Sequence, residues 1–172
     1  MLKGYRMFVL ALLSACATPP IDPPFYRQYR ERYAITADEL KTLQFYISRE
    51  VLAHALDGSP GVEPEQVVIV ASRTPGLVRE AGPDWVRVAF RQGGEGVLFR
   101  IRSDRADAVY ALATTTESGR IALVSELPEP VLTLGGRRYK IVYGADAYLI
   151  VSSHDLGKLI ESRPHPPGLE RE

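Results

Sequence analysis

The chain has 172 residues, with 21 basic and 21 acidic side chains. This balance argues against a nucleic-acid-binding surface, because such a surface needs an excess of positive charge. The single cysteine excludes an internal disulfide and a thiolate metal site, and three histidines argue against a metal enzyme. We therefore expect no metal and no cofactor, and one domain whose stability comes from packing.

The first fifteen residues have the build of a secretory signal peptide. Lys3 and Arg6 precede an apolar run from Met7 to Leu13, and small residues follow that run. The run is too short to span a bilayer as a helix of the mature protein. We expect residues 1–15 to be removed, which leaves a chain with two more acidic than basic residues.

The stretch Leu13-Ser14-Ala15-Cys16 resembles the lipobox of bacterial lipoproteins. The resemblance implies that the chain is cut before Cys16, that this cysteine carries a diacylglycerol thioether, and that the new amino terminus is acylated, with palmitate as a typical chain. Several acyl chains hold a protein firmly on a membrane, whereas one alone binds marginally. Ala17 stands where lipoproteins retained at the inner membrane commonly have aspartate. The resemblance therefore favours the outer membrane, with the domain in the periplasm or at the surface.

A proline-rich stretch follows the cysteine, and its four prolines favour extended backbone. We expect residues 16–34 to be a lipidated linker that lifts the domain from the bilayer. Aromatic and basic side chains of this stretch either rest in the lipid head-group zone or pack on the domain, and both alternatives stay open. These side chains are Phe25, Tyr26, Arg27, Tyr29, Arg30 and Arg32.

The clearest helix signal begins at Thr36, which forms a capping box with Glu39. Apolar residues then recur at helical spacing, which predicts one long helix from Thr36 to Leu56 with a wide apolar surface for a sheet to cover. His54 lies on that surface. We interpret it as structural, because no second metal ligand stands at the required spacing.

From Gln66 onward the hydrophobic period is two, which predicts strands. Short glycine-containing turns between several of these strands indicate antiparallel neighbours. The expected strands cover residues 66–71, 85–91, 97–102, 109–116, 121–126, 131–134, 138–143 and 148–152.

The predicted fold class is therefore mainly β with one N-terminal α-helix (α+β). We expect an antiparallel meander that forms a strongly curved sheet or small barrel with the helix packed on it, and a β-sandwich is the alternative. Residues 35–163 form the expected single domain, and residues 164–172 form an expected disordered tail.

The predicted hairpin around residues 93 and 94 contains a candidate anion site. If these two glycines form the turn, Arg87 lies directly opposite Arg100, which is unfavourable unless the charges are neutralised. The residues either bind a phosphate or carboxylate of a lipid, glycan or peptide, or pair with nearby carboxylates on a solvated face. We favour the second interpretation, because carboxylates are close by in the sequence. The candidate residues are Trp85, Arg87, Arg91, Arg100 and Arg102, and the nearby carboxylates are Glu80, Asp84, Glu95 and Asp104.

The run Ser152-Ser153-His154-Asp155 contains the residue types of a catalytic triad. Neighbours on a strand point to opposite faces and cannot converge, so we interpret the run as a strand end that enters a polar turn. No other catalytic motif stands out.

The leading hypothesis is a membrane-anchored envelope lipoprotein that acts as a non-enzymatic binding or assembly module. Its β domain would bind an envelope protein, a lipid or a glycan, and the N-terminal lipid would bind the membrane. The alternatives are a lipocalin-like carrier of an apolar ligand and a hydrolase with an unrecognised site.

Overall fold

The computed structural model describes residues 22–56, 66–103, 105 and 107–163. The expected signal peptide, the expected lipidation site Cys16 and the expected disordered tail lie outside the described residues. Asp104, one of the candidate carboxylates, lies outside them as well.

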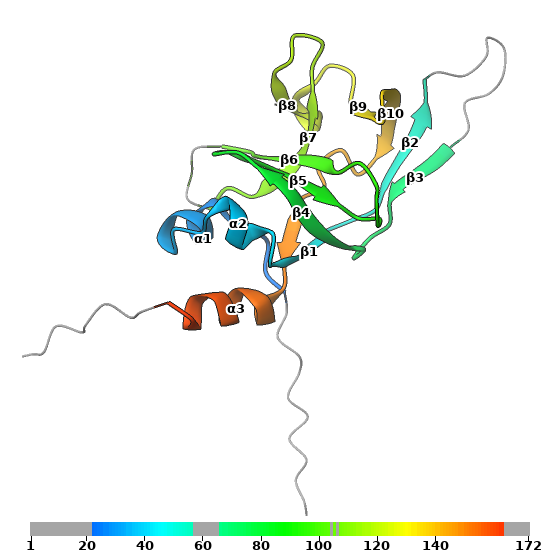
Figure 1. Cartoon of the computed structure of the whole chain (residues 1–172). Coiled ribbons are helices and arrows are strands. Elements are labelled where there is room, and N and C mark those ends of the chain that lie inside the picture. The colour runs from blue at the N-terminus through cyan, green and yellow to red at the C-terminus, as the bar shows by residue number, and fades with distance from the viewer. Residues whose placement is uncertain (1–21, 57–65, 104, 106, 164–172) are drawn as a thin grey trace, which may run out of the picture.

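Two antiparallel sheets make up most of the described chain (Figure 1). The large sheet contains, in spatial order, β11 (Leu149–Val151), β1 (Gln44–Ile47), β4 (Pro75–Ala81), β5 (Trp85–Ala89), β6 (Val97–Ile101), β7 (Tyr110–Thr115) and β8 (Ile121–Leu123). The small sheet contains β3 (Gln66–Val70), β2 (Val51–Ala55), β10 (Arg137–Tyr143) and β9 (Val131–Leu134). The helices are α1 (Arg27–Arg32), α2 (Ala37–Leu40) and α3 (Ser153–Glu161), with a 3-10 turn at Val124–Glu126. Figure 1 shows the helices at one end of the molecule and the small sheet at the other.

Both sheets contribute to one contiguous core. Phe45 and Ile47 on β1, and Val86 and Val88 on β5, are fully buried, and Ala53 of the small sheet joins the same cluster. Burial of alternate residues is typical of strands with one face on a core. The prediction of a mainly β, antiparallel fold is confirmed, but the strands form two sheets and not a closed barrel.

The long helix predicted from Thr36 to Leu56 is wrong, although its start is present. The Thr36 hydroxyl accepts a hydrogen bond from the Glu39 N–H at 3.2 Å, and the Glu39 carboxylate accepts one from the Thr36 N–H at 2.8 Å. The helix nevertheless ends at Leu40, and the chain continues as β1 and β2.

The apolar spacing explains this error. Leu43, Ile47, Val51 and Ala55 are four residues apart, and residues at this interval share one face of a strand as well as one face of a helix. Three of them are buried, as are Phe45 and Ala53 between them. Aromatic and β-branched residues favour strands, and their packing in the sheets outweighs the helical cap.

Residues 22–34, expected as part of a linker, pack against the sheets. Pro24 forms a β-bridge with Ile150, and Tyr26 forms one with Val109. The segment therefore lies between β11 and the start of β7. This position gives its backbone groups protein partners, which a free spacer would lack.

Phe25 is the side chain that fixes this segment. Its N–H donates to the carbonyl oxygen of Leu149 at 2.8 Å. Its ring is fully buried, with its centroid 5.0 Å from that of Phe45 and 5.0 Å from that of Tyr110. Phe25 therefore packs on the domain, which is one of the two alternatives given for the aromatic residues of this stretch.

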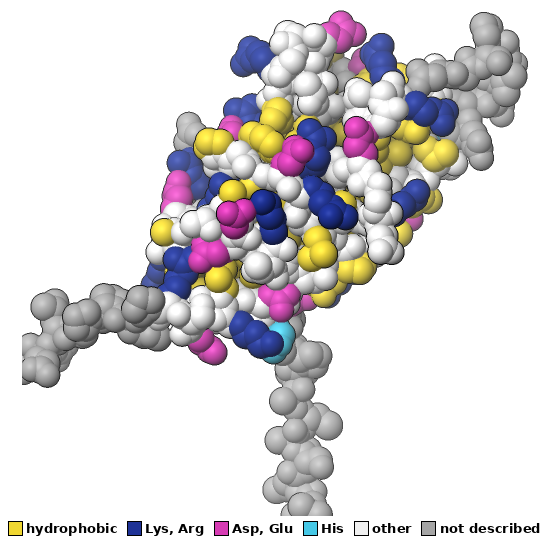
Figure 2. Space-filling model, viewed as in Figure 1, with side chains coloured by type: hydrophobic (Ala, Val, Ile, Leu, Met, Phe, Trp, Pro, Cys, Tyr) yellow, Lys and Arg dark blue, Asp and Glu magenta, His cyan; other side chains and the backbone are white. Residues whose placement is uncertain are grey.

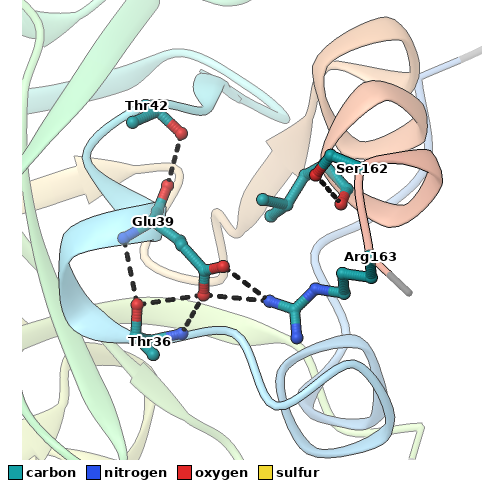
Figure 3. A network of polar contacts seen from close by, with 6 residues as sticks. Thr36, Glu39, Thr42, Ser162 and Arg163 are labelled. Carbon is teal, nitrogen blue, oxygen red and sulfur yellow. Dashed lines mark hydrogen bonds and ion pairs between the residues drawn. The ribbon is translucent and has the colours of Figure 1, made fainter.

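Glu39 connects α2 to Arg163, which lies two residues beyond the end of α3 (Figure 3). One guanidinium nitrogen of Arg163 (Nη2) donates to both carboxylate oxygens of Glu39, at 2.8 and 2.9 Å. The hydrogen bond from the Thr36 backbone, with smaller contributions from the Thr36 hydroxyl and from Arg163, lowers the pKa of Glu39. Segments far apart in the sequence are thus joined at the helical end.

Candidate functional site

An apolar cleft of about 610 Å³ lies where the small sheet meets the β5–β6 loop of the large sheet. This volume is within the range of about 300–1,000 Å³ that is usual for ligand sites. Most of the lining side chains are aliphatic or aromatic, and they come from both sheets. The apolar lining is Ala55, Val67, Val68, Ile69, Val70, Phe90, Val97, Leu134 and Tyr139.

The cleft borders four consecutive residues of β3, Val67 to Val70. The pairing of β3 with β2 is irregular between Val68 and Val70, so the side chains of this stretch do not alternate strictly between the two faces. Val68 is 47% exposed, whereas Val70 is 5% exposed. The sequence signal for this site is the uninterrupted apolar run Val67 to Val70, which is unlike the alternation of a strand with one wet face.

Two arginines and one glutamate make up the charged rim of the cleft. The Glu95 carboxylate accepts a hydrogen bond from the Gly135 N–H, which joins the β5–β6 loop to the β9–β10 turn. The guanidinium of Arg137 lies over the ring of Tyr139, 5.8 Å from its centroid. Arg91 is exposed at the same rim. Among the described lining residues, two guanidinium groups stand against one carboxylate.

The predicted opposition of Arg87 and Arg100 is wrong. In the observed register Trp85 lies opposite Arg100, and Arg87 lies opposite Leu98. The observed register differs from the predicted one by two residues. A shift of two leaves every side chain on its expected face but changes its partner. The cause is the connection, because residues 90–96 form a longer loop instead of a two-residue glycine turn.

Nearby carboxylates pair with both of these arginines, as the favoured interpretation expected. Arg87 Nε lies 3.1 Å from Glu80 Oε2, and Arg100 Nε lies 2.9 Å from Asp84 Oδ2. Arg100 also donates to the carbonyl oxygen of Ile121 at 2.7 Å. The paired side chains are 30–61% exposed, so each pair contributes about 0–1 kcal/mol. On the face shown in Figure 2, basic and acidic side chains are interspersed.

The five residues of the predicted anion site are divided among different places. Trp85 packs against a small apolar cluster that is separate from the main core. Arg91 lies at the rim of the apolar cleft, and Arg87 lines a smaller pocket of about 200 Å³ beside the β9–β10 turn. Arg100 and Arg102 line a second cleft. Of the five, only Arg100 and Arg102 line the same cleft, and Trp85 lies opposite Arg100 in the sheet.

This second cleft, of about 570 Å³, is polar and lies between α1 and β6. Arg30 donates there to the carbonyl oxygen of Pro83 at 3.1 Å and to the Tyr110 hydroxyl at 3.3 Å. Burial raises the pKa of Tyr110 above its ordinary value. Arg27 pairs with Glu31 at 2.6 Å. Protein groups thus already bind these arginines, which weakens the case for an anion site here.

The Ser152 to Asp155 run is the beginning of α3. The Ser152 hydroxyl accepts a hydrogen bond from the Asp155 N–H at 3.2 Å, which caps the helix. The N–H and hydroxyl of Ser153 donate to Asp22 at 2.9 and 3.1 Å. His154 is exposed. The expected polar turn is therefore a helix cap, and α3 itself was not predicted.

Within the part of the chain that the structure describes, no three His, Cys, Asp or Glu side chains are grouped to hold a metal ion. No helix among the described residues is long and apolar enough to cross a membrane. Comparisons with protein-family models, with curated proteins and with solved structures find no match to this chain.

Proposed function

We propose that this protein is a lipid-anchored binding module of the bacterial cell envelope, and that the apolar cleft is its ligand site. The observation that carries the proposal is the lining of the cleft, which combines apolar side chains of both sheets with a charged rim. An apolar wall with a few polar groups is typical of sites that bind without chemistry, because burial supplies affinity and the polar groups orient the ligand.

The composition of the cleft supports binding over catalysis. Its described lining contains no Ser, Thr, Cys or His, so it offers no serine, threonine or cysteine nucleophile and no imidazole base. Its charged groups are Arg91, Arg137 and Glu95, and the backbone of Gly135 binds the glutamate. These groups suit recognition of a ligand that is apolar with an anionic end.

The position of Asp22 supports an anchor close to the domain. Asp22 accepts hydrogen bonds from Ser153 at the start of α3, so the folded part begins no later than this residue. Asp22 is the sixth residue after Cys16, and an extended chain over that interval spans about 20 Å. A lipid on Cys16 would hold the helical end of the domain near the bilayer. The small sheet lies at the other end (Figure 1), so its cleft would face away from the membrane.

Membrane fractionation tests the anchor. We expect the protein to sediment with the envelope membranes and the Cys16→Ser variant to move to the soluble fraction. A variant that stays in the membranes after its leader is cleaved would contradict the anchor.

Binding of an apolar fluorescent dye tests the cleft. In the full chain carrying Cys16→Ser, adding Leu134→Ser at the cleft wall should weaken dye binding by about tenfold, because it removes an apolar wall and leaves a hydroxyl. Leu77→Ser is the matched control, since Leu77 is 47% exposed on β4 and does not line the cleft. Urea unfolding of each variant confirms that it is folded. Equal dye binding by both variants would overturn the site.

A further inference from the structure

We infer that the outer face of the small sheet is a second interaction surface of this protein, and that it binds the same face of a second copy across a two-fold axis. The outer face is the side of β2, β3, β9 and β10 opposite to the side that carries the buried Ala53 and Ile141. The inference goes beyond the proposed function, because it concerns the side of the sheet that the apolar cleft does not use.

Strand pairing fixes which side chains lie on the outer face. Ala53 lies opposite Ile141, and both side chains are buried. Successive side chains of a strand point to opposite faces, so Leu52 points outward. The register shifts between Ile141 and Tyr143, as in a β-bulge, so Val142 and Tyr143 both stand opposite Leu52. They are 47% and 52% exposed, which agrees with an outward direction.

The same pairing separates the outer face from the apolar cleft. Ala55 lies opposite Tyr139, and both residues line the cleft. The next pair along the two strands, His54 with Lys140, points to the other side of the sheet. A change on the outer face of β2 or β10 therefore leaves these walls of the cleft intact.

Exposed apolar side chains are concentrated on the outer face. Val68, which also borders the cleft, lies opposite Leu52, so an apolar row crosses β3, β2 and β10 and ends at Tyr143. Three of the five exposed large hydrophobic side chains of the described residues belong to this face. The five are Leu56, Val68, Leu77, Val142 and Tyr143. Single exposed apolar side chains are normal, whereas a contiguous group marks an interaction surface.

Charges of opposite sign lie on the two sides of this apolar row. His54 and Lys140 lie opposite each other on one side, two residues beyond Leu52 along β2. Glu50 lies on the other side, two residues before Leu52. The residue between Glu50 and Leu52 is buried, so we expect Glu50 to point outward as Leu52 does.

The neighbouring ionic groups are paired within one copy. Arg138 lies 4.0 Å from Glu117 on the basic side of the row, and Arg49 lies 3.0 Å from Asp146 on the acidic side. Glu50 and Lys140 form no ion pair with another described residue. Their charges are therefore available to a partner.

A two-fold axis that crosses the strands at the apolar row would bring these charges together. Such an axis reverses the strand direction, so Glu50 of each copy would lie against the partner's His54 and Lys140, with the two apolar rows packed between them. An interface with this symmetry requires one self-complementary patch. Opposite charges on the two sides of the row meet that requirement, and they would fix the register of the two copies.

The arrangement of the charges favours a second copy over other occupants. An anionic bilayer would meet the carboxylate of Glu50 as well as the ammonium group of Lys140. The proposed anchor also holds the helical end near the membrane, whereas the small sheet lies at the other end (Figure 1). A different protein would not require opposite charges at equal spacing from the row. Two copies tethered to one membrane would meet at a raised effective concentration.

Sedimentation velocity of the full chain carrying Cys16→Ser measures this association. We expect a dimer whose fraction rises with protein concentration. Adding Tyr143→Ser should weaken the dimer by at least about tenfold, because it removes the largest side chain of the apolar row. Leu77→Ser is the matched control and should leave the dimer unchanged, since Leu77 is 47% exposed on β4 of the other sheet. Urea unfolding confirms that each variant is folded.

Exchange of the two charges tests the two-fold arrangement. Glu50→Lys and Lys140→Glu should each weaken the dimer by at least about tenfold, because a two-fold axis repeats each unfavourable contact. The double variant, with both Glu50→Lys and Lys140→Glu, restores opposite charges across the interface and should form the dimer as the parent chain does.

Four results would contradict the inference. A chain that stays monomeric at every concentration would overturn it, and so would a dimer that Tyr143→Ser leaves intact. A double charge variant that associates no better than the single variants would overturn the two-fold arrangement. Binding to phosphatidylglycerol vesicles that Tyr143→Ser abolishes, with no dimer, would assign the face to a bilayer. None of these results affects the dye-binding test of the proposed function, because Tyr143 does not line the cleft.

Discussion

Replacing Phe25 with alanine is expected to lower the free energy of unfolding by about 3–5 kcal/mol. The ring is 0% exposed, so its removal costs the transfer of a whole aromatic side chain plus the cavity left behind. It also removes an edge-to-face contact with Phe45 and a stacked contact with Tyr110, each at 5.0 Å between centroids. Total stabilities of single domains are about 5–15 kcal/mol, so this one change removes a large fraction.

Urea unfolding measures this effect, with fluorescence of Trp85, the one tryptophan in the sequence, as the probe. Gln28→Ala is the control, because Gln28 is exposed on the neighbouring α1 and should change the free energy by no more than about 0.5 kcal/mol. A loss below about 1 kcal/mol for Phe25→Ala would refute the reasoning. Residues 22–34 would then be a spacer, and the estimated distance from Cys16 to the domain would fail with it.

Three further expectations concern a carboxylate, a turn and a surface ion pair. The pKa of Glu39 is lowered by folding, so its stabilisation is present above the unfolded pKa and is lost as the pH falls through the folded pKa. Urea unfolding should therefore show Glu39→Gln to be destabilising at neutral pH, and this difference should disappear once the pH is below the folded pKa. Gly144→Ala should cost about 2–4 kcal/mol, because φ is +81° and the new Cβ would overlap the carbonyl oxygen of Glu50. Gly119→Ala, at φ +78° but in open space, should cost only about 1–2 kcal/mol, and equal losses would contradict the steric argument. Arg87→Ser should change stability by less than about 1 kcal/mol in the same assay, and a larger loss would mean that its ion pair is more than a surface contact.

Turn residues made part of the fold predictable from the sequence. Gly135 and Gly136 both have positive φ and join β9 to β10 with Leu134 opposite Arg137, as expected for a two-residue hairpin turn. Gly119 likewise lies in the turn between β7 and β8. In such turns the backbone conformation depends on the residue type, so the residues of the turn are sufficient to predict it.

The candidate site was less predictable. The spacing of Arg87 and Arg100 gave the correct face of the hairpin but the wrong partner, because the loop between the strands is longer than the two glycines indicate. The carboxylate of Glu95 in that loop binds Gly135, a contact between distant parts of the chain that a local pattern cannot reveal. The apolar cleft likewise forms where the β5–β6 loop lies beside the β9–β10 turn.

By itself, the sequence determined the antiparallel, mainly β character of the chain, the cap at Thr36 and several turns, because these features depend on residues close together along the backbone. The lipid anchor at Cys16 stays a prediction from the lipobox. Only the tertiary structure decided that residues 44–55 are strands, that Phe25 belongs to the core, and that β3 borders an apolar cleft. A spacing of four residues fits either a helix or a strand, so burial against residues distant in the sequence selects between them.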